Sequence, residues 1–244
     1  MIRVALKIQI VRDYREMSRK AAAHVVGALR RRPDLLLGAV TGASPLETYK
    51  RLARTRARSP KLFARLRVMA MDEWMGLPRG HEATCEVFLR NEVIGPLKID
   101  RRRWQSWRSD ARNAGKEVAR VARWLKKEGP MDLCILGLGT NGHVLMNEPG
   151  PSFEPGPRAA RLLPSTRRHS MVRALRPRPK YGYCLGLREI LESREIVLLV
   201  SGRSKRAPLR CALSGRVRTS APASFLWLHP RVTVYCDREA AGKR

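Results

Sequence analysis

Hydrophobic and polar positions along this chain follow two alternating periods, which predict strands and helices in succession. Short runs that are apolar almost throughout are typical of strands buried on both faces of a sheet, and they occur at residues 35–40, 66–71, 133–137 and 195–200. Apolar residues at helical spacing predict helices at residues 17–29, 84–91 and 113–127. Strands that alternate with helices predict an α/β fold with crossover connections and a mostly parallel sheet.

The remaining segments complete this picture. After the Thr41-Gly42-Ala43 turn, Ser44 as N-cap, Pro45 at the first helical position and Glu47 as capping-box partner predict a helix to about Arg58. Residues 224–228 and 232–236 predict two late strands around the His229-Pro230 turn, and residues 151–182, rich in Pro, Arg and Ser, predict a lid. No repeat or linker divides the chain, so we expect one domain, residues 1–244, with a Rossmann-like three-layer fold.

Composition narrows the class of protein. The chain is 43% hydrophobic, and no apolar stretch is long enough to cross a membrane or to act as a signal peptide. The five cysteines stand singly, which fits a reducing cytoplasm and provides no zinc framework. We therefore expect a cytoplasmic protein, and no sequence pattern calls for a cofactor. The sequence leaves open whether the protein forms a homo-oligomer.

The charge is unusual for such a chain. Lys and Arg total 50 against 21 Asp and Glu, a net charge of +29 that would attract any polyanion. The basic residues are spread over predicted helices and loops, and no RNA-recognition signature, zinc finger or helix-turn-helix accompanies them. We interpret them as a solvated arginine-rich surface and do not expect nucleic acid as the partner.

Unusual residues follow three of the predicted strands. Val40 leads into Thr41-Gly42-Ala43-Ser44, Met71 leads into Asp72-Glu73, and Gly137 leads into a glycine-rich turn that ends in His143. The carboxyl ends of parallel strands lie along one edge of an open sheet, where α/β proteins bind ligands. The sequence therefore predicts that these three turns share one crevice.

The first of these turns predicts an anion site. Free N–H groups at a helix N-terminus, two hydroxyls and the helix dipole favour a phosphate at Thr41, Gly42, Ala43 and Ser44. Lys205, at another strand-to-helix junction, could add a point charge. An ordinary tight turn and a solvated lysine remain the alternative interpretation.

The other two turns predict proton-transfer chemistry. His143 can give and take protons near neutral pH, and Glu148 could orient its ring or stabilise its charge. Asp72 is a candidate general base because a shielded carboxylate can titrate near neutrality, whereas Glu73 points to the other side and is expected to be structural. These residues suit an enzyme acting on a phosphorylated metabolite.

Several long motifs resemble the amino-sugar-6-phosphate deaminase/isomerase family. They are TGASPLETY at 41–49, MDEWMGLP at 71–78, LGLGTNGHVLMNEPG at 136–150, LREILESREIVLLVSGRSK at 187–205 and PASFLWLHP at 222–230. Together they cover nearly the whole chain, in the family's order. The TCEVFL, GTNGH and ASFLWLH segments resemble the galactosamine-6-phosphate branch more than the glucosamine-6-phosphate branch.

The resemblance implies a reaction for these residues. The sugar phosphate would bind the Thr41–Ser44 turn and Lys205, and His143 with Glu148 would open the pyranose ring. Asp72 would move a proton from C2 to C1, and loss of ammonia from galactosamine 6-phosphate would give tagatose 6-phosphate. No metal is required, because shuttled protons and hydrogen-bonded oxyanions can carry the charge.

Two positions depart from the family pattern or leave it undecided. The glucosamine branch usually has aspartate where this chain has Asn141, an amide that can hold the histidine by hydrogen bonding but cannot supply charge. We therefore expect Glu148 to supply more of the negative charge that stabilises the protonated histidine. Family members also bring a lid arginine to the phosphate, and here both Arg168 and Arg173 are candidates.

Three alternative functions remain open from the sequence. The first is a glucosamine-6-phosphate deaminase that produces fructose 6-phosphate. The second is a 6-phosphogluconolactonase, whose family shares the histidine turn but lacks the NEPG continuation that contains Glu148. The third is a non-catalytic regulator that senses a sugar phosphate and binds nucleic acid through its basic surface.

Overall fold

The computed structural model of the chain describes residues 6–151 and 155–243. A central parallel sheet has the strand order β1-β10-β9-β6-β2-β3-β5. Its strands are β1 (Lys7–Val11), β2 (Leu36–Ala39), β3 (Arg67–Ala70), β5 (Trp104–Gln105), β6 (Leu133–Gly137), β9 (Ile196–Val200) and β10 (Val232–Asp237). Every pairing in this sheet is parallel, as the alternation of strand and helix patterns predicts.

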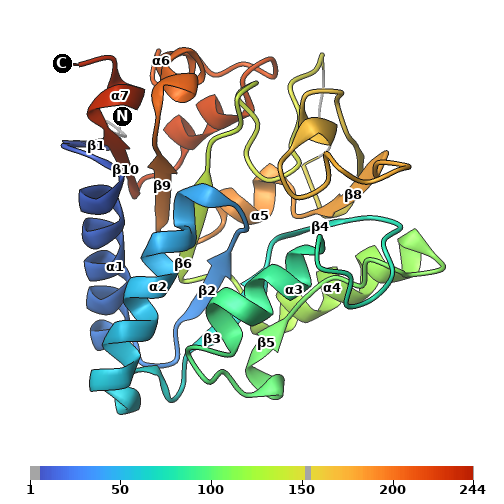
Figure 1. Ribbon diagram of the computed structural model, residues 1–244, viewed down its shortest axis with the longest axis horizontal. Coiled ribbons are helices and arrows are strands. Elements are labelled where there is room, and N and C mark those ends of the chain that lie inside the picture. Colours follow the sequence, from blue (N-terminus) through green and yellow to red (C-terminus); the bar gives the residue numbers. More distant parts are fainter. Residues whose placement is uncertain (1–5, 152–154, 244) are drawn as a thin grey trace.

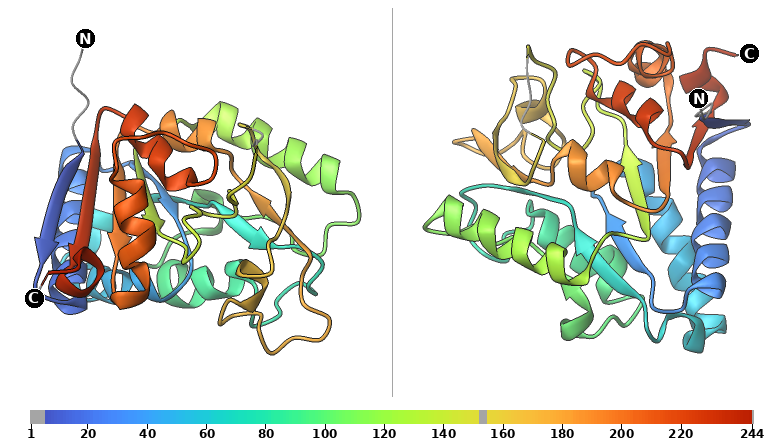
Figure 2. Two further views of the ribbon diagram at one scale, coloured as in Figure 1. Left: turned by 90° about the horizontal axis from the view of Figure 1, so that it is seen from above. Right: turned by 180° about the vertical axis from the view of Figure 1, so that it is seen from behind.

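Helices cover both faces of the sheet, so the predicted three layers are confirmed (Figures 1 and 2). α1 (Tyr14–Arg31), α2 (Ala43–Arg58) and α3 (Cys85–Leu89) lie on one face, and α4 (Ala114–Glu128) and α5 (Leu187–Leu191) lie on the other. α6 (Arg206–Ala212) and α7 (Arg238–Ala241) pack together near the C-terminus. No helix in the described ranges combines the length and apolar character needed to span a membrane.

Burial explains why these segments adopt these elements. Every residue of β2, β9 and β10 is buried, because helices cover both faces, and this produces the near-continuous apolar runs in the sequence. α1 instead buries one stripe, which includes Met17, Ala21 and Val25, and exposes its charged side. The structure thus confirms most of the predicted elements with small changes of boundary.

Two local predictions are wrong. α2 begins at Ala43 with Gly42 as its N-cap, and Ser44 therefore lies inside the first turn; Glu47 forms ion pairs with Arg51 and Arg54 and completes no capping box. Residues 222–228 form a 3-10 helix where a strand was expected at 224–228. A five-residue apolar run fits a buried strand or a buried helix equally well, and Pro222 at the start favours the helix here.

The predicted lid at 151–182 contains more regular structure than its composition suggests, and its residues 152–154 lie outside the described residues. β7 (Arg158–Arg161) and β8 (Tyr181–Cys184) pair with each other, and β8 also pairs with β4 (Asp72–Trp74) in a small antiparallel sheet. The lid is therefore joined by backbone hydrogen bonds to the strand that begins at Asp72.

The strand order places a switch point between β2 and β6. From β2 the chain continues outward through β3 and β5, whereas from β6 it continues in the opposite direction through β9 and β10. The connections that leave β2 and β6 therefore diverge and open a crevice beyond the carboxyl ends of these strands.

Candidate active site

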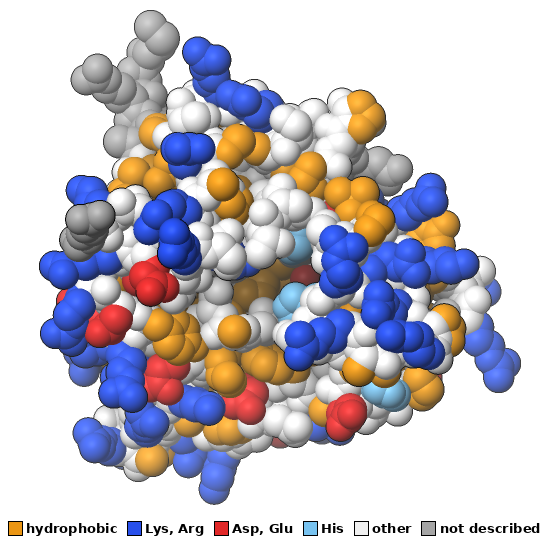
Figure 3. Space-filling view, turned by 45° about the horizontal axis from the view of Figure 1, so that its top comes forward, with side chains coloured by type: hydrophobic (Ala, Val, Ile, Leu, Met, Phe, Trp, Pro, Cys, Tyr) orange, Lys and Arg blue, Asp and Glu red, His pale blue; other side chains and the backbone are white. Residues whose placement is uncertain are grey.

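A cavity of about 740 Å³ occupies this crevice. Seven of the nine site residues predicted from the sequence line it: Thr41, Gly42, Ala43, Ser44, Asp72, His143 and Lys205. Figure 3 shows a hollow on this side of the molecule with histidine side chains in its wall and Lys and Arg side chains around it. The structure thus brings the three strand-end turns together, and the other two predicted residues, Asn141 and Glu148, contact His143.

The turn that follows β6 is shaped around the ring of His143. A Cβ on Gly139 would lie 2.5 Å from three atoms of the imidazole, closer than carbon atoms approach in folded proteins. The amide of Gly139 also donates to the carbonyl oxygen of His143 at 2.9 Å, which closes the turn. Only glycine at position 139 therefore allows the imidazole to lie flat against the backbone of its own turn.

Two side chains contact Nδ1 of the His143 ring, and a third holds one of them in place. Oε2 of Glu148 lies 3.6 Å from Nδ1, and Oγ1 of Thr166 lies 3.2 Å from the same nitrogen. Asn141 donates through Nδ2 to Glu148 and to Oγ of Ser165, and its Oδ1 accepts the backbone N–H of His143. These contacts occupy Nδ1 and leave Nε2 as the ring atom available for proton transfer.

Glu148 is ionised in this environment. Burial opposes its ionisation, but the contacts from His143, Thr166 and Asn141 outweigh burial and hold the pKa of Glu148 below its ordinary value. The backbone N–H of Leu163, in the lid, also donates to Oε1. Glu148 therefore carries a negative charge beside the ring of His143.

Asp72 lies just after the carboxyl end of β3, and one of its carboxyl oxygens is buried without a hydrogen-bond partner among the described residues. Asp72 is only 9% exposed, and this oxygen is Oδ1. Burial raises the pKa of Asp72 to about 7. A carboxyl group of this kind exchanges a proton readily near neutral pH, as a general base must.

Glu73 has the structural role expected for it. Its carboxylate accepts the backbone N–H groups of Trp74, Cys85 and Glu86. These bonds join β4 to the first turn of α3 and hold the loop beneath Asp72. Glu73 is therefore committed to the backbone and does not contact the cavity.

The Thr41–Ser44 turn presents the N-terminus of α2 to the cavity. Gly42 has a φ of 108°, a conformation that side chains with a Cβ rarely adopt. The hydroxyl of Tyr14 donates to the carbonyl of Ala43 at 2.6 Å and accepts the N–H of Glu47 at 3.0 Å. Sequence patterns did not indicate Tyr14, which fixes the turn from the neighbouring helix α1.

Lys205 reaches the same end of the cavity from the opposite strand. It ends the short 3-10 helix at Arg203–Lys205 after β9, and burial lowers the pKa of its amine. Asp237 accepts hydrogen bonds from the Ser201 hydroxyl and the Gly202 amide and so anchors the turn that leads to Lys205. This half-buried cation and the N-terminus of α2 line one cavity, an arrangement that suits an anion.

The lid contributes four cavity residues that the predicted strand ends do not include: Ser165, Thr166, Arg168 and His169. Of the two candidate lid arginines, Arg168 lines the cavity and Arg173 does not; the backbone carbonyl of Arg173 accepts hydrogen bonds from Arg176 and Arg178. The weak periodicity of the lid sequence explains why its pattern did not indicate Thr166 or His169.

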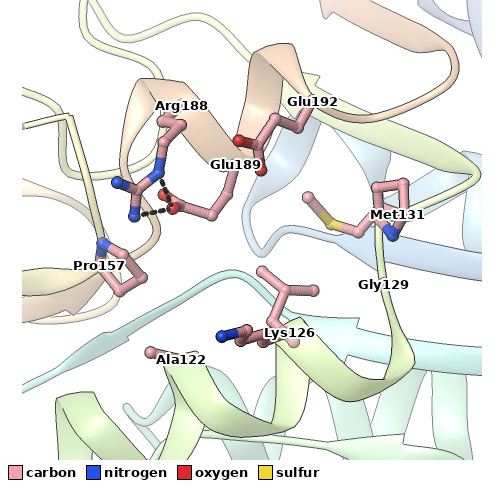
Figure 4. Close-up of a pocket in the computed structure, with 10 residues that line it drawn as sticks. Ala122, Lys126, Gly129, Met131, Pro157, Arg188, Glu189 and Glu192 are labelled. Atoms are coloured by element: carbon pink, nitrogen blue, oxygen red, sulfur yellow. Dashed lines mark hydrogen bonds and ion pairs between the residues drawn. The ribbon is translucent and has the colours of Figure 1, made fainter.

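A second cavity, of about 560 Å³, lies at the amino end of β6 (Figure 4). α4, the loop at Gly129–Met131 and α5 form its walls. Its buried carboxylate, Glu189, already accepts hydrogen bonds from Arg188 and from the amide of Gly186. Because these hydrogen bonds commit the Glu189 carboxylate to holding α5, we take the cavity at the carboxyl ends of the strands as the candidate active site.

Among the residues described, no three His, Cys, Asp or Glu side chains are grouped to hold a metal ion.

Comparison with known proteins identifies the family of this chain. The model of the family described as glucosamine-6-phosphate isomerases/6-phosphogluconolactonase matches residues 13–235. The chain is 36% identical over 222 residues to AgaI of Escherichia coli (strain K12), a protein named a deaminase, with 91% of this chain and 88% of AgaI covered. It is 31% identical over 240 residues to a glucosamine-6-phosphate deaminase of Clostridium botulinum (strain Langeland), with 98% of both chains covered.

Solved structures extend the comparison. A monomeric glucosamine-6-phosphate deaminase superposes with a TM-score of 0.92 at 31% identity, covering 98% of this chain and 100% of that one. The 6-phosphogluconolactonase of Trypanosoma brucei superposes with a TM-score of 0.74 at 17% identity, covering 98% of both chains, and shows the same fold. This chain therefore belongs to the family of glucosamine-6-phosphate isomerases and 6-phosphogluconolactonases.

Proposed function

We propose that this enzyme converts galactosamine 6-phosphate and water to tagatose 6-phosphate and ammonia. The observation that carries the proposal is a buried, unpartnered carboxyl group, Asp72, in the same cavity as a carboxylate-supported histidine and an anion site. Proton transfer between neighbouring carbons of a phosphorylated sugar needs these three elements.

The phosphate would bind at the N-terminus of α2 beside Lys205. The free N–H groups of the helix and the half-buried amine favour a dianion there. An anchored phosphate fixes the position of the sugar ring, so that the same two carbons face Asp72 in every molecule bound.

His143 would open the pyranose ring. Its available Nε2 takes the O1 hydroxyl proton and delivers it to the ring oxygen, and Glu148 stabilises the imidazolium form between these two transfers. Thr166 and Asn141 hold this pair of side chains in place.

Asp72 would then carry out the isomerisation. Its carboxylate takes the proton from C2, leaving an enolamine, and returns the proton to C1. The resulting C2 iminium adds water and expels ammonia, which leaves a ketone at C2. Because the pKa of Asp72 is raised to about 7, its protonated and ionised forms are both available at neutral pH.

The preference for galactosamine over glucosamine rests on the TCEVFL, GTNGH and ASFLWLH segments. The relatives named as glucosamine-6-phosphate deaminases make that substrate the second candidate. The two sugars differ in the orientation of one hydroxyl, so a few hydrogen bonds separate them.

The test is ammonia release from galactosamine 6-phosphate and from glucosamine 6-phosphate, side by side, with a metal chelator present. We expect release from both, faster from the galactosamine substrate. A preference for glucosamine would retain the mechanism and overturn the choice of substrate. No ammonia from either would contradict a deaminase, and hydrolysis of 6-phosphogluconolactone would then identify a lactonase.

A further inference from the structure

His169 lies in the lid and faces the cavity from above the Thr41–Ser44 turn. Its ring packs on Trp74 with centroids 5.8 Å apart and an angle of 37° between the planes. It lines the same cavity as Asp72 and Lys205. Packing against Trp74 fixes the position of a polar ring that the reaction described above does not use.

The hydrogen bonding of His169 defines where its proton lies. The backbone N–H of Met171 donates to Nδ1 at 3.3 Å, so Nδ1 is an acceptor and carries no hydrogen. In a neutral imidazole the proton must then be on Nε2. Burial, with the positive charges of His143 and Lys205, lowers the pKa of His169 and favours this neutral form.

Nε2 of His169 lies close to the proposed phosphate site. It is 3.9 Å from the position that a Cβ on Gly42 would occupy, at the N-terminus of α2. Within the described ranges no protein group accepts this N–H, although Nδ1 has its donor. The N–H therefore remains available to a molecule bound in the cavity beside the N-terminus of α2.

We propose that His169 donates its Nε2 hydrogen to the phosphate group of the substrate. This inference rests on the proposed phosphate site at the Thr41–Ser44 turn. The Lys205 ammonium acts on that site as a point charge, whose attraction depends little on orientation. The neutral imidazole instead supplies a directed hydrogen bond from the lid. Binding of phosphate therefore also holds the lid segment against the cavity.

The test uses inorganic phosphate as the probe, so it does not depend on turnover. Three substitutions separate the functions of the ring. His169→Gln retains an N–H at the Nε2 position, His169→Asn retains an amide near Nδ1 but no group at the Nε2 position, and His169→Phe retains only the ring on Trp74. Calorimetry measures the dissociation constant of phosphate for each full-length protein, with Lys205→Ala as the control for the site itself.

We expect His169→Asn and His169→Phe to weaken phosphate binding by about 10- to 100-fold, as for loss of a hydrogen bond to a charged group, and His169→Gln to bind within a few-fold of the native protein. With the substrate, the first two variants should raise KM more than they lower kcat. In 15N-histidine spectra the native ring should show the Nε2–H form, and its signals should shift when phosphate is added.

Two results would overturn the inference. Unchanged phosphate affinity in both His169→Asn and His169→Phe, with weakened binding in Lys205→Ala, would remove His169 and leave the phosphate site intact. Failure of the native protein to bind phosphate, or native affinity in Lys205→Ala, would overturn the proposed phosphate site and this inference with it.

Discussion

Asn141 donates its Nδ2 hydrogen to Oε2 of Glu148 at 2.9 Å, so its amide contacts the carboxylate and not the imidazole of His143. The sequence suggested that the amide would hold the histidine ring itself. Its other contact with His143 is through Oδ1, which accepts the backbone N–H. Asn141 therefore acts on the ring indirectly, by fixing the carboxylate beside it.

This contact predicts the effect of Asn141→Asp, the residue usual in the glucosamine branch. An ionised aspartate cannot donate to Glu148, and two carboxylates in contact raise the pKa of one of them. We expect kcat to fall about 10- to 100-fold at pH 8 and less at pH 6, where the pair can share a proton. The ratio of variant to native kcat across this pH range measures the effect.

Asn91→Asp is the matched control, because Asn91 is exposed and does not line the cavity. It adds the same charge and should leave the pH profile unchanged. Native activity of Asn141→Asp at every pH would show that the hydrogen bond to Glu148 has no part in catalysis.

Asp72→Asn should abolish ammonia release while phosphate still binds. Amides are not bases at neutral pH, so we expect kcat to fall by about 100- to 10,000-fold, the usual contribution of a general base. Calorimetry with inorganic phosphate should give nearly native affinity. Asp110→Asn, at an exposed position, serves as control, and substantial turnover by Asp72→Asn would remove Asp72 as the base.

The same substitution should stabilise the fold at high pH. The folded-state pKa of Asp72, about 7, lies above its unfolded value near 4, so the native protein is favoured when this group is protonated. That contribution is fully present below pH 4 and is lost as the pH rises through 7, by up to about 4 kcal/mol. Asp72→Asn, which never ionises, avoids the loss.

Chemical denaturation of both proteins at pH 5 and pH 8 measures this difference. We expect the advantage of Asp72→Asn in free energy of unfolding to be larger at pH 8. An advantage that is equal at both values would show that Asp72 does not titrate between them.

Gly139→Ala should disable the site without unfolding the protein. The new Cβ would meet the His143 imidazole at 2.5 Å, so the ring must leave its place beside Glu148 and Thr166. We expect a loss in kcat of at least about 100-fold, as for removal of an acid–base group. Gly115→Ala is the control, because its Cβ would make only an ordinary 3.5 Å contact near the start of α4. If Gly139→Ala keeps native activity, the close approach of the ring is not required.

Much of the sheet could be predicted because burial on both faces leaves a clear mark in the sequence. β2, β6 and β9 are short apolar runs, and the parallel order follows from the helices between them. β4 and β7 show no apolar run of this kind in the sequence. Each is three or four residues long and belongs to the small antiparallel sheet beside the central one. Their pairing depends on contacts between distant segments, which local patterns do not encode.

The residues at strand ends could be predicted for a similar reason, whereas Tyr14, Thr166 and His169 could not. The sheet fixes where Asp72 and His143 emerge, so topology alone brings them together. Tyr14 reaches the Thr41–Ser44 turn across a helix–helix contact, and Thr166 and His169 reach the cavity through a lid with weak periodicity. Only three-dimensional packing reveals those contacts.

The pairing of β8 with both β4 and β7 fixes the two ends of the lid and leaves the residues between β7 and β8 outside the sheet. Asp72 and His143 follow strands of the central sheet, whereas Thr166, Arg168 and His169 belong to the insertion between β7 and β8. Over evolutionary time, substitutions or length changes within that insertion can alter which sugar is accepted while the reacting groups stay in register. One scaffold can in this way give rise to enzymes for several sugars.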